Sequence, residues 1–417
     1  HNGYKVYDDT GCQLLPEAAD QVVQYVNEVE DELNIKVFSD EEAYPYMTWI
    51  GEEVDEAYYK EVMAIEVNPG MDKSDFKIVF SPQHGTSNIA VRTCLTRLGY
   101  DLVPVLAQCA PDPDFSNTKS PNPEVPASYE LAIKKAKEVD ADVVVITDPD
   151  GDRLGVVAKH NGEYVLMSGN QSAAVYLEYI LSQMKEKGTL PDNAVMYNTI
   201  VTSDLGELVA RSYGVDVEKT LTGFKFIGDK IRKYEQTHEK TFVFGYEESY
   251  GYVIKDFVRD KDSFQATLLL SEVASYYKEH GKTLIQVLYD LFEEFGYYLE
   301  GVHNIGLAGI EGSKRIEKIM RYFQSADLTS LAGKHIKTFE DYDKLIKTEN
   351  GKESKLTLPQ SFVLKYIFDD GGWFVLRPSG TEPKLKIYIA IKGKTEEESR
   401  ALIATLKQEI LNIIDRI

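Results

Sequence analysis

The chain has 417 residues, of which 43% are hydrophobic, and a formal net charge of -22. This length is enough for several buried cores and about two to four domains. The acidic charge excludes nonspecific nucleic-acid binding, which needs a basic surface. No segment is long and apolar enough to cross a bilayer, and the first residues have neither the basic flank nor the apolar run of a signal peptide. The prediction is a globular cytoplasmic protein that binds neither nucleic acid nor membrane.

Strand and helix patterns alternate from residue 77 onwards. Residues 77–80 predict a strand, the apolar stripe over 90–98 predicts a helix capped by Gly99, and another strand begins at about Asp101. The stretch SYELAIKKAKEVDADVVVITD repeats this order, and residues 194–252 repeat it again. Such alternation predicts tandem α/β domains with mixed, mainly parallel sheets, whose ligands bind at the carboxyl ends of the strands.

The C-terminal part has a different pattern. Residues 361–393 read as consecutive strands, and an amphipathic helix runs from Thr395 to about Ile414. Strands followed by a helix predict an α+β domain at this end of the chain.

Three aspartates come after a β-branched run in VVVITDPDGDRLG: Asp148, Asp150 and Asp152. Clustered carboxylates repel and raise one another's pKa unless a cation neutralises them. In a turn this cluster indicates a hard divalent ion, and Mg²⁺ (magnesium) is the best candidate. Arg153 comes next and is placed to hold a phosphate oxygen beside the ion. We call residues 148–153 the acidic loop.

The acidic loop has other interpretations. An EF-hand is excluded, because Arg153 and Lys159 stand where that loop needs glycine and a bidentate glutamate. A solvated acidic turn stays open, since Asp and Gly are common in turns. A haloacid-dehalogenase-like phosphatase also stays open: its D-x-D-G pattern would make Asp148 the nucleophile, but it explains no other loop.

Two further loops suit a phosphorylated sugar. Residues 377–383, RPSGTEP, offer a guanidinium, hydroxyls and glycine N–H groups, which together can bind an anion; we call them the arginine loop. Residues 245–252, GYEESYGY, place carboxylates and a hydroxyl just beyond a strand; we call them the glutamate loop. The alternatives are an ordinary hairpin turn for the first and a polar loop or helix cap for the second.

Taken together, these loops resemble a known family. TDPDGDR, LTGFKFIG, GYEESYGY and RPSGTEPKLKIY, in this order and spacing, are similar to the metal, interdomain, sugar and phosphate loops of the α-D-phosphohexomutases. SPQHGTSN and KSPNPE extend the similarity over nearly the whole chain. The YEES form of the glutamate loop most resembles the phosphoglucomutase branch that includes phosphopentomutase-like members.

The resemblance implies a four-domain enzyme that interconverts glucose 1-phosphate and glucose 6-phosphate. A phosphoserine would donate its phosphoryl group, with glucose 1,6-bisphosphate as the intermediate and activator. The expected domains are residues 1–70, 71–167, 168–299 and 300–417. A phosphopentomutase or another phosphohexomutase is the alternative within the family.

Residue roles also come from the resemblance. The aspartates would hold Mg²⁺ against the phosphoserine, and Arg153 would position the phosphoryl group. The sugar and phosphate ligands would be Glu247 and Ser249 for sugar hydroxyls, and Arg377, Ser379, Gly380 and Thr381 for the phosphate that does not react. Lys225 and His84 are candidates for proton transfer or phosphate contact; a surface lysine and a packed loop histidine are the alternatives.

The sequence departs from the family pattern at the nucleophile. The serine should lie in a T-A-S-H-N-P loop, and no such stretch occurs in the sequence, whose opening HNGYKVYDDTG is similar to the strand that comes directly after that loop in the family. The expectation is that residues 1–70 are the tail of the first domain and that the chain as given is inactive. A non-catalytic sugar-phosphate-binding fragment is the corresponding alternative. Apolar residues near the start should then lack partners: Tyr4, Val6, Val22, Val23 and Val26.

Overall fold

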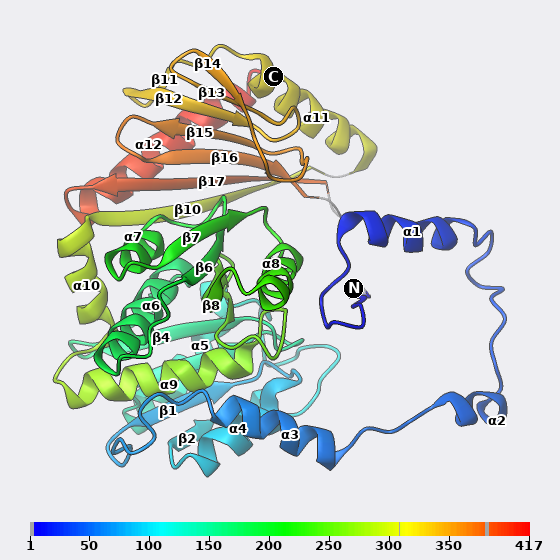
Figure 1. Cartoon of the computed structure of the whole chain (residues 1–417), viewed down its shortest axis with the longest axis vertical. Helices are drawn as coiled ribbons and strands as arrows, with labels where there is room; N and C mark the ends of the chain where they lie inside the picture. Colours follow the sequence, from blue (N-terminus) through cyan, green and yellow to red (C-terminus); the bar gives the residue numbers. More distant parts are fainter. Residues whose placement is uncertain (1–3, 308, 380–382) are drawn as a thin grey trace. The chain divides into compact units, whose positions relative to one another are not determined.

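The computed structural model describes residues 4–307, 309–379 and 383–417 (Figure 1). The chain divides into two compact units: unit 1 is His1–Asn198 with Ala210–Gln286, and unit 2 is Thr199–Val209 with Val287–Ile417. Within the described ranges, no helix is both long and apolar enough to cross a membrane.

Unit 1 begins with elements that bury nothing. α1 (Pro16–Asn27), α2 (Asp40–Ala43) and η1 (Tyr44–Tyr46) contain no buried residue. α3 (Glu52–Met63) is the first helix to contribute to a core, through Tyr59 and Val62. The apolar residues expected to lack partners are exposed: Tyr4, Val6, Val22, Val23 and Val26.

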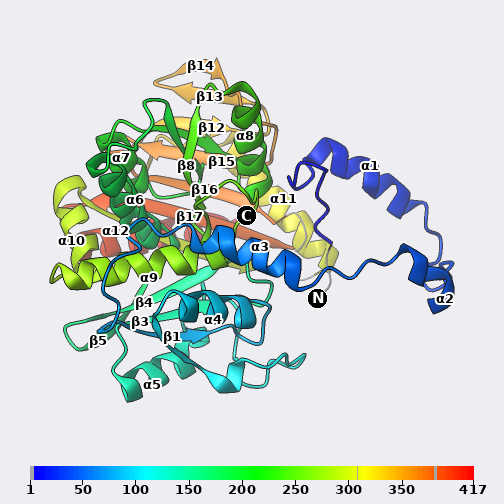
Figure 2. The ribbon, with the colours of Figure 1, turned by 60° about the horizontal axis from the view of Figure 1, so that its bottom comes forward.

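A five-stranded mixed sheet, in the order β2-β1-β3-β4-β5, carries the acidic loop. Its elements are β1 (Lys77–Ser81), α4 (Ser87–Arg97), β2 (Asp101–Pro104), η2 (Leu106–Gln108), η3 (Pro126–Tyr129), α5 (Glu130–Val139), β3 (Val143–Thr147), β4 (Leu154–His160) and β5 (Glu163–Met167). β1, β2 and β3 are parallel, whereas β4 and β5 are antiparallel additions. Every residue of β3 is buried, because α5 and α9 cover opposite faces of the sheet (Figure 2).

A four-stranded sheet, in the order β7-β6-β8-β9, carries the glutamate loop. The elements of this region are α6 (Gly169–Glu186), β6 (Ala194–Thr199), α7 (Leu205–Ser212), β7 (Asp216–Thr220), α8 (Phe224–Thr237), β8 (Thr241–Glu247), β9 (Gly251–Val253), α9 (Ser263–Glu279) and α10 (Leu284–Phe295). β6 and β8 are parallel, and β9 turns back antiparallel to β8. The apolar face of α8 packs on this sheet through Phe224, Ile227 and Ile231.

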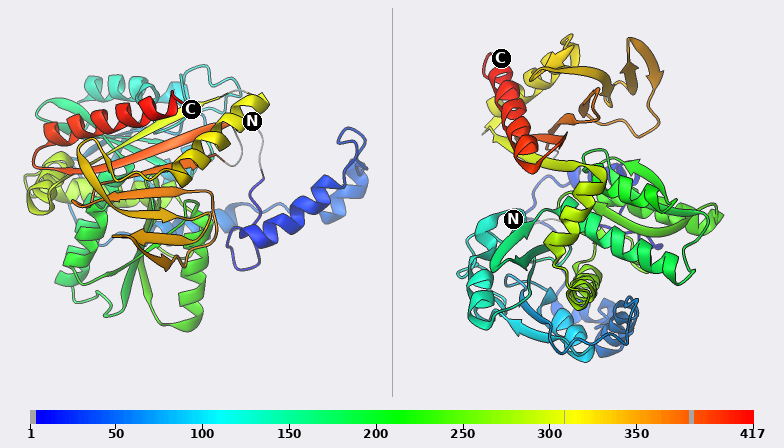
Figure 3. Two further views of the ribbon diagram at one scale, coloured as in Figure 1. Left: turned by 90° about the horizontal axis from the view of Figure 1, so that it is seen from above. Right: turned by 90° about the vertical axis from the view of Figure 1, so that its left-hand side faces the viewer.

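Unit 2 contains an antiparallel sheet in the order β10-β17-β16-β15-β12-β13-β14, and β11 pairs with β12. Its elements are β10 (Tyr297–Gly306), α11 (Gly309–Ser325), β11 (Ser330–Leu331), β12 (Lys334–Asp341), β13 (Ile346–Glu349), β14 (Lys352–Lys355), β15 (Leu364–Phe368), β16 (Trp373–Pro378), β17 (Lys384–Gly393) and α12 (Glu396–Ile414). Alternate residues of β17, from Leu385 to Ile391, join the core beneath α11 and α12, and both helices lie on one face of the sheet (Figure 3).

These elements confirm the expected fold class: mixed α/β sheets followed by an α+β domain. The predicted strand at 77–80 is β1, and Gly99 has a φ of +85° just after α4, as a helix-ending glycine should. The predicted C-terminal helix is α12, with Thr395 as its N-cap. The sheets of unit 1 are more mixed than the alternation suggested, because β4, β5 and β9 add as antiparallel hairpins, which need no crossover helix.

Candidate active site

The acidic loop is a tight turn at the carboxyl end of β3. Asp148 Oδ1 accepts hydrogen bonds from the backbone N–H groups of Asp152, at 3.1 Å, and Arg153, at 2.9 Å. Gly151 has a φ of +74°, a left-handed conformation that glycine adopts without strain. The turn therefore folds around the first aspartate and holds the other two beside it.

The three carboxylates converge. Ligand oxygens from Asp148, Asp150 and Asp152 all lie within 4.8 Å of one another. Asp148 is 2% exposed, whereas the Asp150 side chain is 59% exposed. Asp148 Oδ2 and Asp152 Oδ1 are buried and accept no hydrogen bond from the described residues. Converging carboxylate oxygens, two of them buried without a hydrogen bond, are the donor set that a hard divalent cation takes, so the residues fit Mg²⁺.

Three basic side chains surround this cluster. Lys5 Nζ lies 2.6 Å from Asp152 Oδ2 and 3.1 Å from Asp150 Oδ2. Lys261 Nζ lies 3.0 Å from the same oxygen of Asp152. Arg153 Nε lies 2.9 Å from Asp148 Oδ2. The cations and carboxylates alternate, and this arrangement lowers the cost of keeping the carboxylates together.

The surroundings shift the pKa values of Asp148 and Asp152 in opposite directions. Burial, reinforced by the nearby charge of Asp152, raises the pKa of Asp148 to about 7. Burial also disfavours the charged form of Asp152, but the ammonium groups of Lys261 and Lys5 outweigh it and hold its pKa well below the usual range. The guanidinium of Arg153 offsets the raised pKa of Asp148 only in part, and a divalent ion would add a further opposite charge beside Asp148.

The KSPNPE stretch holds the arginine of the acidic loop. Arg153 Nη1 lies 3.1 Å from Glu124 Oε1 and 3.5 Å from Asn122 Oδ1. Burial opposes the charge of Arg153, but Asp148 and Glu124 raise its pKa, so it stays a guanidinium cation. Glu124 thus orients the side chain that was predicted to position a phosphoryl group.

The SPQHGTSN stretch forms hydrogen bonds with the acidic loop and with the end of β3. Thr86 N donates to Pro149 O at 2.9 Å, and Ser87 Oγ lies 2.5 Å from Thr147 Oγ1. The His84 side chain contacts a different loop, because its Nδ1 lies 2.7 Å from Ala110 O. Its buried Nε2 has no hydrogen-bond partner within the described residues. The structure therefore places His84 beside the loop but does not bond it to the aspartates.

The glutamate loop adjoins the acidic loop within unit 1. Leu154 N donates to Tyr250 O at 2.9 Å, and Arg153 forms an isolated bridge with Gly251. Glu247 is 4% exposed, and its Oε1 accepts from Gly223 N at 2.6 Å. Ser249 is half-exposed. The metal candidates and the sugar candidates are thus neighbours in space.

Two details of this region bear on the sequence expectations. Glu247 is the last residue of β8 rather than part of a free loop, and it bonds to the LTGFKFIG stretch. Lys225, from that stretch, is half-buried with its Nζ 5.4 Å from the ring centroid of Phe226. The tyrosines of the glutamate loop are all buried: Tyr246, Tyr250 and Tyr252.

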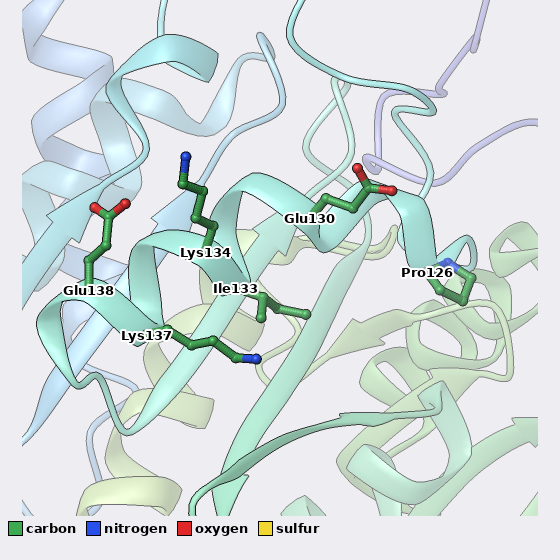
Figure 4. A pocket seen from close by; sticks show the side chains of 6 residues that line it. All are labelled: Pro126, Glu130, Ile133, Lys134, Lys137 and Glu138. Carbon is green, nitrogen blue, oxygen red and sulfur yellow. The ribbon is translucent and has the colours of Figure 1, made fainter.

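A pocket of about 700 Å³ opens beside the acidic loop. Its lining includes Lys5, Tyr7, Asp150, Asp152, Arg259 and Lys261. A second pocket, of about 610 Å³, lies along α5, but its charged side chains fan out from the helix instead of converging (Figure 4). The pocket at the acidic loop is the better candidate because it combines a concave surface with converging polar groups.

The arginine loop belongs to unit 2 and joins β16 to β17. Ser379 N donates to Lys384 O at 2.8 Å, which closes the hairpin. Arg377 Nη1 lies 3.4 Å from Tyr388 Oη, and Arg377 pairs in register with Lys386 on β17. Gly380 and Thr381 lie outside the described residues. Arg377 and Lys386 are therefore neighbours on adjacent strands, next to the predicted phosphate loop.

Sequence reasoning missed several residues that the structure brings to these loops. Lys5 is 145 positions from Asp150, and no local pattern indicates their contact. Lys261 lies in a DKD stretch that follows the glutamate loop closely in the sequence. This closeness could have indicated that Lys261 contacts the site. Glu124 belongs to the KSPNPE stretch, but the pattern of that stretch assigns it no role.

Comparison with known proteins identifies the family. Models of the phosphoglucomutase/phosphomannomutase family match three parts of the chain: α/β/α domain II over residues 56–162, α/β/α domain III over 168–295, and the C-terminal domain over 335–413. The expected boundaries after residues 70, 167 and 299 stay a prediction.

Curated relatives agree with these matches. The chain is 35% identical over 396 residues to a phosphoglucomutase of Staphylococcus aureus strain MRSA252, covering 94% of this chain and 70% of the relative. It is 36% identical over 396 residues to a phosphoglucomutase of Staphylococcus epidermidis, covering 94% of this chain and 71% of the relative.

Solved structures share the fold. Parafusin, a phosphoglucomutase from Paramecium solved in an open form, matches with a TM-score of 0.64 at 17% identity, over 97% of this chain and 72% of its own. A phosphoglucomutase/phosphomannomutase family protein from Burkholderia thailandensis matches with a TM-score of 0.57 at 18% identity, over 87% of this chain and 65% of its own. The chain therefore belongs to the phosphoglucomutase/phosphomannomutase family of the α-D-phosphohexomutase superfamily, whose members are phosphotransferase enzymes.

Proposed function

We propose that the protein is a phosphoglucomutase, which interconverts glucose 1-phosphate and glucose 6-phosphate through a phosphoserine and a glucose 1,6-bisphosphate intermediate. The observation that carries the proposal is the acidic loop, whose carboxylates converge beside the glutamate loop within one unit. The names of the Staphylococcus relatives support the substrate. A distant relative, an N-acetylphosphoglucosamine mutase of Aspergillus fumigatus, was solved with glucose 1,6-bisphosphate.

The acidic loop would hold Mg²⁺ through Asp148, Asp150 and Asp152. When bound, the ion would offset negative charge on a transferring phosphoryl group. Arg153, held by Glu124, would contact an oxygen of that group. The chain's own part of the chemistry is therefore to orient and neutralise the phosphoryl group.

The sugar and the second phosphate would bind to other loops. Glu247 would accept hydrogen bonds from sugar hydroxyls, and Ser249 would donate to them or accept from them. In the arginine loop, Arg377, Ser379, Gly380 and Thr381 would bind the phosphate that does not react. Lys225 and His84 remain candidates for proton transfer or phosphate contact. A phosphopentomutase is the alternative within the family.

The haloacid-dehalogenase-like alternative is disfavoured by the geometry of the acidic loop. Its nucleophile would be Asp148, which is 2% exposed and uses Oδ1 to accept two backbone hydrogen bonds. A nucleophilic carboxylate must reach the substrate phosphorus, and one that organises its own turn is poorly placed for this.

Metal binding is the first test. Titration calorimetry of the full chain should show Mg²⁺ binding that Asp150→Asn weakens by about tenfold or more, because one of three anionic ligands is lost. Asp192→Asn, in another loop, is the matched control and should bind as the unchanged chain does. Equal affinity for Mg²⁺ in all three proteins would refute the metal site.

Turnover tests the reaction. We expect no conversion of α-glucose 1-phosphate by the chain as given, with Mg²⁺ and a trace of glucose 1,6-bisphosphate, because its residues include no T-A-S-H-N-P stretch. Turnover by the chain alone would show that the nucleophile lies among these residues.

A further inference from the structure

Lys5 holds the same carboxylates that would bind the metal. Its ammonium group contacts Oδ2 of both Asp150 and Asp152, at 3.1 and 2.6 Å. Lys261 also contacts Oδ2 of Asp152, at 3.0 Å, but its side chain is only 16% exposed, whereas that of Lys5 is 42% exposed. Lys5 is thus the more exposed of two cations that neutralise one carboxylate.

An ammonium group and a divalent ion compete at such a site. Mg²⁺ binds oxygen at about 2.0–2.1 Å and demands near-octahedral geometry, so it needs the lone pairs of these oxygens directed at itself. A lysine within hydrogen-bond distance of two of the oxygens takes those lone pairs, and it repels an ion placed between them. We propose that Lys5 is a built-in counter-ion of the acidic loop, which Mg²⁺ must displace in order to bind.

The segment that carries Lys5 has a separate anchor. We call residues 4–14 the N-terminal strap. Cys12, 3% exposed, donates from Sγ to Gly228 O at 3.4 Å, and Tyr7 Oη donates to Asp260 Oδ2 at 2.6 Å. The strap also closes on itself, since Leu14 N donates to Val6 O and Asp8 N donates to Cys12 O. Cys12 keeps the strap attached when Lys5 leaves.

This competition has two consequences. Lys5 sets the affinity of the acidic loop for metal, and metal binding loosens the first half of the strap. These effects are reciprocal, because two ligands of one site weaken each other by the same factor. The inference rests on the proposed metal site, and it adds a residue of this chain that opposes metal binding.

Calorimetry tests the first consequence. Lys5→Gln keeps a side chain of similar length without the charge, and it should bind Mg²⁺ more tightly by about fivefold, the scale of a partly exposed ion pair. Lys5→Arg should bind as the unchanged chain does. Lys36→Gln, which removes a lysine near Phe38 in the same part of the chain, is the control for net charge. Unchanged or weaker binding by Lys5→Gln would overturn the proposal.

Hydrogen exchange tests the second consequence. Mg²⁺ should increase amide exchange in residues 4–8 of the unchanged chain, whereas sodium chloride at equal ionic strength should not. If the chain binds Mg²⁺ but exchange in residues 4–8 does not change, the proposed competition by Lys5 is wrong and the metal site is unaffected. Absence of Mg²⁺ binding in both the unchanged chain and Lys5→Gln would instead overturn the metal site on which it rests.

Discussion

Gly85 shows how one residue without a side chain supports the acidic loop. A Cβ added there would lie 2.4 Å from Pro149 Cα and 2.5 Å from Pro149 O. Both atoms belong to the backbone of the turn between Asp148 and Asp150, so they cannot move aside as a flexible side chain would. The close contact lets Thr86 donate its hydrogen bond to the same proline.

Gly85→Ala should therefore disturb the loop. We expect a loss of about 1–3 kcal/mol in the free energy of unfolding, as for other overpacked sites. Mg²⁺ affinity should fall about tenfold or more, because the change shifts the support of the metal ligands. Urea unfolding and calorimetry measure the two effects.

Gly70→Ala provides the matched control. Nothing lies within 4 Å of a Cβ added at Gly70, so this change should leave the free energy of unfolding within about 0.5 kcal/mol. The same loss in both variants would mean that the contact with Pro149 is not the cause.

Among the elements, α12 shows how a local signal and a tertiary contact combine. Thr395 Oγ1 accepts from Glu398 N at 3.2 Å, which satisfies one of the unpaired N–H groups at the start of the helix. Leu406, Ile410 and Ile414 then bury one face of the helix against the sheet of unit 2. The cap sets where the helix begins, and the apolar stripe sets which face is buried.

Removing the cap should weaken unit 2. Thr395→Ala is expected to cost about 1 kcal/mol, the usual value for an N-cap. Thr405→Ala, an exposed threonine within the same helix, should be neutral or slightly stabilising, because alanine is the better helix former. Thermal unfolding compares the two, and an equal loss from both would contradict a capping role for Thr395.

At the scale of the whole molecule, burial is uneven along the chain. The two units have their own sheets and cores. The stretch from Glu28 to Gly51, by contrast, contains no buried residue, and all of it except Ala43 is exposed. Backbone that is neither buried nor paired in a sheet is the preferred target of proteases.

Chymotrypsin should cut this stretch first. Its expected sites are the exposed aromatic residues Phe38, Tyr44, Tyr46 and Trp49. Buried aromatic residues of the two units, such as Phe80 and Phe374, should be protected until those units unfold. Mass spectrometry of the early fragments identifies the cuts; first cleavage within residues 77–200 would contradict this distribution of burial.

Much of the fold was predictable because its signals are local. β-branched runs mark β1 and β3, and Gly99 marks the end of α4. The antiparallel additions β4, β5 and β9 were not distinguished from parallel strands, because the direction of a strand depends on the length and path of its connection rather than on its side chains. The order of strands in each sheet likewise depends on long-range pairing.

The candidate site likewise has features that the sequence predicts and features that depend on long-range packing. The spacing of Asp148, Asp150 and Asp152 directly after a strand was enough to predict their convergence, because one turn brings them together. The orientation of His84 towards Ala110, and the burial of Glu247 at the end of β8, result from the packing of neighbouring loops.

By itself, the sequence determined the α/β and α+β classes, the acidic loop as a metal candidate, and the resemblance that the family comparison confirmed. Only the tertiary structure decided which cations from outside that loop neutralise it, namely Lys5 and Lys261, and which carboxylate orients Arg153, namely Glu124. The physical reason is distance along the chain. The three carboxylates are close in the sequence, so their repulsion can be inferred from the sequence. The lysines that balance it lie far away in the sequence, and only folding brings them into contact with the aspartates.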